Sequence, residues 1–278
     1  MGLIDIGANL AHDSFDADRD AVLARAAQAG VEAIVVTGSS LDSSRKALAL
    51  ARAPAFAGVT EPAGVTPALY ATAGLHPHHA SEYSAAHEAA FRELAQDGKL
   101  VALGECGLDY FRMLAPAAEQ RRAFVAQLTL AAELTKPLFL HQRDAHADFL
   151  AILKEHRGQL AEVVVHCFTD TAAARDDCLA LDCYIGITGW ICDERRGLPL
   201  REVARGIPLD RLLVETDSPY LLPRSAPKSA GRRNEPMYLP EVVRALALAR
   251  GESEAEVAAA TTANARRFFG VGVGAVKP

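Results

Sequence analysis

The sequence predicts an α/β fold in which eight strands and their helices close into a (β/α)8 TIM barrel. Short apolar segments alternate with longer amphipathic segments along the 278 residues, which indicates parallel strands buried on both faces. Eight strand–helix units in so short a chain fit a closed barrel better than an open doubly wound sheet. Side chains able to bind a metal follow several different strands, which is where a barrel collects its chemistry.

The strands are expected where short runs rich in Val, Leu and Ile end in turn or loop residues. These runs cover 3–8, 33–37, 69–74, 100–105, 137–141, 162–167, 183–188 and 211–216. Helical patterns lie between and after them, at 17–29, 41–53, 84–97, 117–135, 145–157, 171–181, 197–206, 238–250 and 254–268.

The strand–helix alternation has one interruption, at residues 54–68. This stretch holds three Pro and two Gly without periodicity, and we expect a surface excursion because the alternation resumes directly after it. We therefore expect one domain over residues 1–270. The Gly-rich residues 271–278 are expected to form a flexible tail.

Composition narrows the classes of partner. The net charge of −6 gives no general attraction to nucleic acid or membrane, so a bound polyanion needs a local basic patch. The five cysteines are scattered and form no C-x-x-C pair, which is typical of a reduced cytosolic protein. No segment approaches the roughly 18 apolar residues of a membrane span. We expect a cytoplasmic protein without a membrane partner, and a monomer.

Four side chains able to bind a metal follow four of the expected strands. They are Glu105 in LVALGEC, His141 in PLFLHQRD, His166 in EVVVHCF and Asp217 in RLLVETDSPY. Taken singly, each has a structural alternative: an ion pair with a core Arg, a hydrogen-bonded histidine, or an Asx turn. Because strand ends meet at one face of a barrel, the four together favour a divalent-cation site that activates water.

Further polar residues are expected at the same face. His76 and His78 in GLHPHH are candidates for substrate contact or proton transfer, with a polar loop cluster as the alternative. Asp109 follows Glu105 by four residues and is a candidate to orient a metal ligand.

Basic and aromatic residues gather in the loops of this face. The arginine forks match phosphate geometry, although a solvated surface is the alternative. Trp190 and Tyr220 can stack a nucleobase there or pack under a loop. The basic residues are Arg143, Arg195, Arg196, Arg224, Lys228, Arg232 and Arg233.

At these residues the chain resembles the TatD family of metal-dependent deoxyribonucleases. The matching segments follow the family's order over nearly the whole chain. They are DIGANL (5–10), AGLHPH (73–78), GECGLDY (104–110), EQRRAFVAQL (119–128), LHQRDAH (140–146), VVHCFT (164–169), YIGITGWICDERRG (184–197), LLVETDSPYLLPR (212–224) and RRNEP (232–236).

The resemblance implies a TIM barrel of the metallo-dependent hydrolase type and a Mg²⁺-dependent 3′–5′ exodeoxyribonuclease acting on single-stranded ends, with a role in DNA repair. Mn²⁺ and Zn²⁺ are alternative ions, and one or two ions are expected. The implied metal ligands are Glu105, His141, His166 and Asp217, with catalytic roles for Asp217, Glu105 and His76. We expect substrate contacts from His78, Arg143, Arg224 and Arg233. The alternatives are a metallohydrolase of amides or cyclic small molecules, and a non-catalytic binding scaffold.

The chain departs from the family pattern near the first strand. Many relatives carry H-x-H there, whereas this sequence has Gly7 and Asn9. Glycine cannot bind a metal through a side chain, and an asparagine amide oxygen suits Mg²⁺ better than Zn²⁺. An ion nearest this strand is therefore expected to be weakly held.

Overall fold

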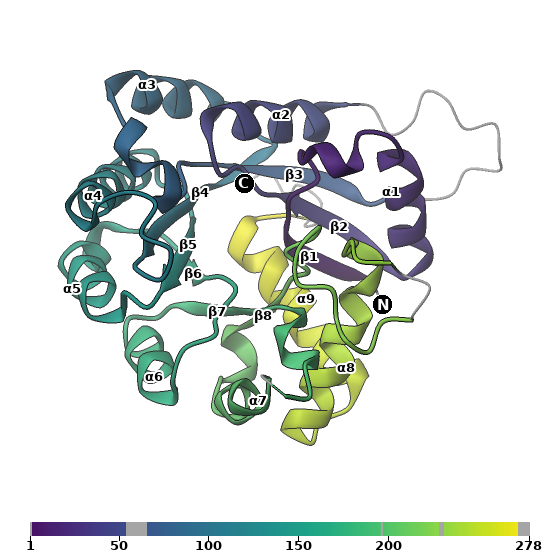
Figure 1. Cartoon of the computed structure of the whole chain (residues 1–278). Helices are drawn as coiled ribbons and strands as arrows, with labels where there is room; N and C mark the ends of the chain where they lie inside the picture. The colour runs from purple at the N-terminus through teal and green to yellow at the C-terminus, as the bar shows by residue number, and fades with distance from the viewer. Residues whose placement is uncertain (1, 54–65, 196, 228–230, 272–278) are drawn as a thin grey trace, which may run out of the picture.

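The eight predicted strands form one parallel sheet that curls into a barrel with helices around it (Figure 1). The computed structural model describes residues 2–53, 66–195, 197–227 and 231–271. In this part of the chain the strands lie in sequence order. They are β1 (Leu3–Ala8), β2 (Val31–Val36), β3 (Ala68–Ala73), β4 (Leu100–Asp109), β5 (Leu138–Arg143), β6 (Val163–Val165), β7 (Tyr184–Ile187) and β8 (Leu212–Val214).

The helices follow the strands as the amphipathic patterns predict. They are α1 (Arg19–Gln28), α2 (Leu41–Arg52), α3 (Ala85–Leu94), α4 (Ala117–Leu134), α5 (His146–His156), α6 (Ala172–Ala180), α7 (Leu198–Arg205), α8 (Leu239–Arg250) and α9 (Glu254–Phe269). Side-chain caps fix several starts: Ser40 and Ser43 form a capping box at α2, and Ser253 and Glu256 form another at α9.

Polar contacts join β8 to β1 at the carboxyl ends of the strands. Asp217 donates its backbone N–H to the carbonyl of Gly7 at 2.8 Å, and Asn9 donates to Ser218 at 2.7 Å. Below them, the buried Asp5 carboxylate accepts from the N–H and the hydroxyl of Thr216. The loops after β1 and β8 are therefore held together, and residues in both face the barrel mouth.

The barrel interior is an apolar cluster that α9 closes from the amino-terminal ends of the strands. Inward side chains such as Ile6 and Phe139 pack in one cluster with Phe268 and Phe269 of α9. The ring of Phe268 also lies edge-on to Tyr184 at 5.2 Å. Because this end is filled, an open site has room only at the carboxyl ends.

The predicted fold class is confirmed, and β4 extends beyond its predicted end at residue 105. β4 runs on to Asp109 because its last residues still pair with β5, up to Asp109 opposite Arg143. Gly107 has φ +145°, and a Cβ there would lie 1.9 Å from the carbonyl oxygen of His141, so only glycine permits this close approach. Residues 54–65 of the expected excursion and 272–278 of the expected tail lie outside the described residues.

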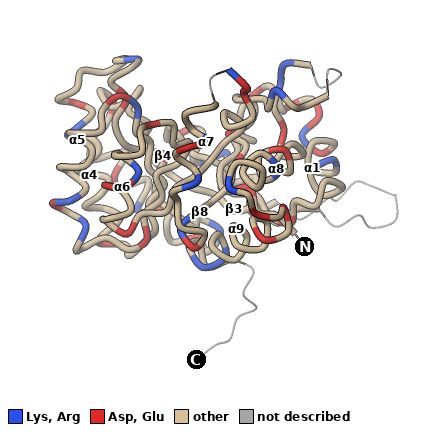
Figure 2. Tube along the Cα trace, turned by 90° about the horizontal axis from the view of Figure 1, so that it is seen from below, with Lys and Arg blue, Asp and Glu red and all other residues tan. Residues whose placement is uncertain are grey.

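Two general features bear on possible partners. In the described residues, no helix has the length and apolar character needed to cross a membrane. Figure 2 shows Lys and Arg interspersed with Asp and Glu along the trace. Recognition of a polyanion therefore depends on a local arrangement of charges.

The packing of α9 into the barrel interior gives a stability prediction. Phe268→Ala removes a ring that is only 2% exposed, so we expect a loss of about 3–5 kcal/mol in unfolding free energy. The control is Leu248→Ala on α8, where the side chain is 79% exposed and a change within about 0.5 kcal/mol is expected. Urea unfolding of both variants measures the difference, and equal midpoints would contradict the stabilising role of Phe268 in the barrel interior.

Candidate metal centre

Three histidines surround one carboxylate oxygen at the mouth of the barrel. Oε1 of Glu105, in β4, lies 2.8 Å from Nε2 of His166 and 3.1 Å from Nδ1 of His141. Nε2 of His76 approaches the same oxygen at 3.3 Å. The three rings come from the ends of β6, β5 and β3, so four adjacent strand ends build the cluster.

Charge and burial set the protonation of this cluster. Burial alone raises the pKa of Glu105, but the charges and hydrogen bonds of the histidines outweigh it and hold the pKa well below its ordinary value. Burial lowers the pKa of His76 to about 4, which leaves its imidazole neutral at physiological pH. Burial also acts to lower the pKa of His166, but its carboxylate neighbours raise that pKa well above its ordinary value. An anionic oxygen and a neutral imidazole are therefore available to a cation.

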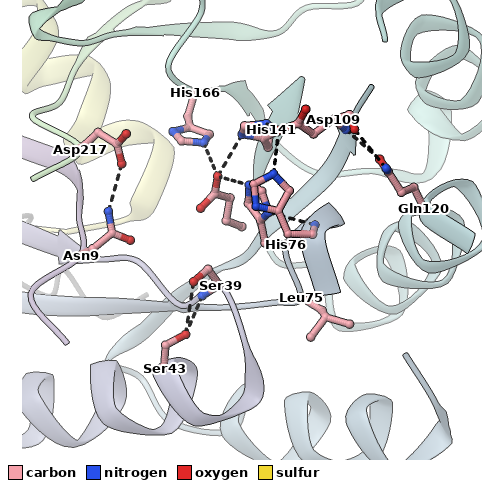
Figure 3. A network of polar contacts seen from close by, with 12 residues as sticks. Asn9, Ser39, Ser43, Leu75, His76, Asp109, Gln120, His141, His166 and Asp217 are labelled. Carbon is pink, nitrogen blue, oxygen red and sulfur yellow. Dashed lines mark hydrogen bonds and ion pairs between the residues drawn. The ribbon is translucent and has the colours of Figure 1, made fainter. Parts of the chain in front are cut away.

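All four predicted ligands line one cavity, but among the described residues only Glu105 and His141 fall in the closest group of possible metal ligands, which His76 completes. Donor atoms of His76, Glu105 and His141 all lie within 4.8 Å of one another, so His76 joins the group able to hold a metal rather than standing only beside the substrate. Asp217 lines the same cavity from the His166 side (Figure 3). Burial raises the pKa of Asp217 to about 7.

Asn9 positions the Asp217 carboxylate. Its side-chain amide donates to Oδ1 of Asp217 at 3.0 Å (Figure 3). The first strand, where the family resemblance leads us to expect H-x-H and the chain has Gly7 and Asn9, thus reaches the site through an asparagine.

Two glycines make room for a buried carboxylate that the sequence analysis did not single out. A Cβ on Gly7 would lie 2.5 Å from Oε2 of Glu215, and a Cβ on Gly186 would lie 2.8 Å from Oε1. Glu215 is fully buried. A side chain at Gly7 would therefore enter the space of Glu215. An acid two residues before Asp217 in LLVETD was the available signal.

Glu215 lies behind one of the candidate ligands. Its Oε2 is 3.3 Å from Nδ1 of His166, and its Oε1 accepts from the N–H of Cys167 at 2.5 Å. When a metal takes the place of the proton on Nε2, the proton that remains on Nδ1 points to Glu215, which is how a carboxylate behind a ligand histidine selects its tautomer.

Asp109 plays the corresponding part on the other side of the cluster. Its Oδ2 lies 2.8 Å from Nε2 of His78 and 3.4 Å from Nε2 of His141. Asp109 is itself fixed by Gln120 of α4, which accepts from its N–H and donates to its carbonyl (Figure 3). His78 is therefore held beside the candidate ligand His141 by a shared carboxylate.

The cluster opens into a cavity of about 730 Å³ with arginines among its lining residues. Arg112, Arg143 and Arg232 line it together with Trp190 and Tyr220. Within the described ranges, none of these three guanidinium groups has a carboxylate at ion-pair distance. They remain available to an anionic ligand.

Two arginines expected to contact substrate do not line this cavity. Arg233 is bonded to Asp18 and Glu235, at 2.7 and 2.8 Å, and does not line the cavity. Arg224 lies 3.5 Å from Glu194 and is also absent from the cavity lining. Both side chains thus have carboxylate partners outside the cavity. Arg196 and Lys228 lie outside the described residues.

Comparison with known proteins settles the family. Residues 4–270 match the family model described as TatD related DNase. This chain belongs to the TatD family. The chain is 49% identical over 269 residues to a protein of Erwinia tasmaniensis named 3'-5' ssDNA/RNA exonuclease TatD, covering 96% of this chain and 99% of that one. A protein of the same name from Escherichia coli K12 is 47% identical over 270 residues, covering 97% and 99%.

A solved structure of a TatD homologue from Escherichia coli K12 agrees with the fold. It superposes with a TM-score of 0.85 at 30% identity, covering 97% of this chain and 98% of that one.

The donor set of this TatD-family chain fits a divalent cation. One buried carboxylate oxygen faces three imidazole nitrogens, and a second carboxylate lines the same cavity. Imidazole suits Zn²⁺ and other transition metals, whereas carboxylate oxygen suits Mg²⁺ and Mn²⁺. The set therefore accommodates all three ions considered from the sequence.

The contact between Glu215 and His166 gives a testable consequence for metal affinity. Glu215→Gln keeps the shape but removes the charge behind His166, so we expect Co²⁺ to bind about 10- to 100-fold more weakly. Titration followed by the visible absorption of bound Co²⁺ measures this directly. The control is Glu202→Gln on α7, whose side chain is 68% exposed. Equal Co²⁺ affinity in the two variants would show that Glu215 only fills space.

Proposed function

We propose that this protein is a metal-dependent nuclease that removes nucleotides from the 3′ end of single-stranded DNA. The observation that carries the proposal is a buried cluster of side chains able to bind a metal, which opens into a cavity lined by three arginines that have no carboxylate partner among the described residues. The names of the relatives, 3'-5' ssDNA/RNA exonuclease TatD, support it and add RNA as a second substrate to be tested.

The residues proposed to hold the ion are those that face one another across the cavity. A bound divalent ion supplies an activated water and neutralises charge on the scissile phosphate. The proposed ligands are His76, Glu105, His141, His166 and Asp217. We propose Mg²⁺ as the working ion, with Mn²⁺ and Zn²⁺ as alternatives and one or two ions bound.

Asp217 is the proposed general base. It lines the cavity on the side away from His76, and the amide of Asn9 holds its carboxylate in place. A carboxylate in this position can accept a proton from the attacking water. Glu105, bonded to the histidines, instead fixes the geometry of the ligands.

The cavity wall supplies the proposed substrate contacts. Arg143, with Arg112 and Arg232 in place of Arg224 and Arg233, would bind phosphate oxygens as charge develops in the transition state. Tyr220 and Trp190 offer surfaces on which the terminal base can stack. His78, held by Asp109, is proposed to contact the substrate beside the ion.

The cellular setting is part of the proposal. The five cysteines are free thiols, which supports action in the reducing cytoplasm. We propose that the enzyme acts there as a monomer on single-stranded ends that arise during DNA repair.

The first test of function concerns the ion and the base. We expect hydrolysis of a single-stranded oligonucleotide to stop in EDTA and return with Mg²⁺ or Mn²⁺. Asp217→Asn should lower kcat by roughly 10²- to 10⁴-fold because it removes the proton acceptor but keeps the shape. Asp176→Asn on α6, with a side chain 64% exposed, is the matched control. Full hydrolysis in EDTA, or an Asp217→Asn variant as active as the control, would contradict the proposal.

The second test separates the two groups of arginines. Arg143→Ala should raise KM and reduce the slope of log KM against log salt concentration by about 0.7, the loss of one contact to a single-stranded phosphate. Arg233→Ala should lower the melting temperature, because it breaks the ion pairs with Asp18 and Glu235, and leave the salt slope unchanged. If instead Arg233→Ala reduces the salt slope and Arg143→Ala leaves it unchanged, Arg233 is the residue that contacts phosphate.

A further inference from the structure

The loop between β4 and α4 exposes three large apolar side chains beside the cavity. Phe111 is 58% exposed, Met113 48% and Leu114 65%. We call these three residues the apolar ledge. The described residues hold six exposed large hydrophobic side chains, and half of them lie in this loop. Such clustering marks an interaction site, whereas scattered apolar residues do not.

The ledge stands on a fixed backbone. The fully buried Gln120 donates hydrogen bonds to the carbonyls of Asp109 and Ala115, at 3.0 and 2.8 Å. These bonds hold both ends of the loop in place. Inside the loop, Oδ1 of Asp109 accepts from the N–H of Arg112 at 2.8 Å. The apolar side chains are therefore presented to solvent by a loop whose shape is held from within.

Positive charge adjoins the ledge. The guanidinium of Arg143 lies 4.3 Å from the centroid of the Phe111 ring, and Arg143 and Arg112 both line the cavity. Neither has a carboxylate partner in the described part of the chain. An occupant of this surface must combine a flat apolar face with negative charge a few ångströms away.

We propose that Phe111, with Arg143 stacked on it, binds a base of the single strand on the 5′ side of the scissile bond. The inference rests on the proposed nuclease function and adds a subsite to it. A nucleotide meets both demands, because its base stacks on an aromatic ring and its phosphate pairs with arginine. If the 3′-terminal nucleotide occupies the cavity, the strand that leaves it towards the ledge is the 5′ part.

The decisive experiment is an abasic scan. Ten-residue deoxythymidine oligonucleotides carry a 5′ fluorophore, a phosphorothioate at the terminal linkage to block hydrolysis, and one abasic residue at successive positions. Binding to the intact protein in Mg²⁺ is followed by fluorescence anisotropy. We expect one position upstream of the 3′ nucleotide where removal of the base weakens binding about fivefold or more.

Variants assign that position to the ledge. In Phe111→Ala, the abasic residue should no longer weaken binding at any one position, and the affinity for the unmodified oligonucleotide should fall by the same factor. Phe111→Tyr keeps a ring, so it should retain the wild-type affinity and the wild-type dependence on the abasic position. Leu248→Ala removes an apolar side chain that is 79% exposed and does not line the cavity, and it serves as the control. A flat abasic scan, or Phe111→Ala binding like the control, overturns the subsite.

Two further outcomes separate this inference from its alternatives. If Phe111→Ala converts a wild-type dimer to a monomer in sedimentation, the ledge binds a second copy and the subsite is overturned. If unmodified oligonucleotides are hydrolysed at rates independent of Phe111, the subsite fails and the nuclease function stands. If binding depends on one base position and on Phe111 as expected, but unmodified oligonucleotides are not hydrolysed with any ion tested, the nuclease function fails. The apolar ledge then remains a site that binds single strands.

Discussion

The buried carboxylate of Glu105 is the constraint on which the rest of the site depends. A charge removed from water costs several kcal/mol unless partners compensate it, and this one is compensated by imidazoles from three other strands. The barrel makes that possible, because only a closed parallel sheet brings so many strand ends to one point. Gly107 contributes by letting β4 lie close against β5, which brings Glu105 and His141 together. Fold and site are thus fixed by the same packing.

A second set of acids lies behind the first. Glu215 contacts the far nitrogen of His166, and Asp109 stands between His78 and His141. Each carboxylate holds a ring in one orientation, which pre-organises the donors before a ligand arrives. Several carboxylates in so small a volume repel one another, and a divalent cation relieves that repulsion. The arrangement is therefore better suited to binding a cation than to stabilising the fold alone.

Much of this could be predicted from the sequence, and the limits have physical causes. Apolar runs bounded by turns specify strands locally, so the barrel and the convergence of Glu105, His141, His166 and Asp217 on one cavity followed from their places at strand ends. The sequence analysis missed Glu215 because the space for its side chain is left by glycines in two other strands. Nothing in the sequence around Glu215 indicates that contact. Arg233 does not line the cavity because it is paired with Asp18 and Glu235, and the pairing with Asp18, 215 residues away, cannot be read from the local sequence.

The most direct test of the central claim is anomalous diffraction from crystals soaked in Mn²⁺. A cation held by the Glu105 cluster predicts a strong anomalous peak at coordination distance, roughly 2.0–2.5 Å, from Oε1 of Glu105 and from imidazole nitrogens of His76 and His141. The distances between Glu105 and the histidines should then increase as the ion replaces the direct contacts. Peaks found only at surface carboxylates, with Glu105 still bonded directly to His141 and His166, would show that the cluster is a structural ion-pair network and not a metal centre.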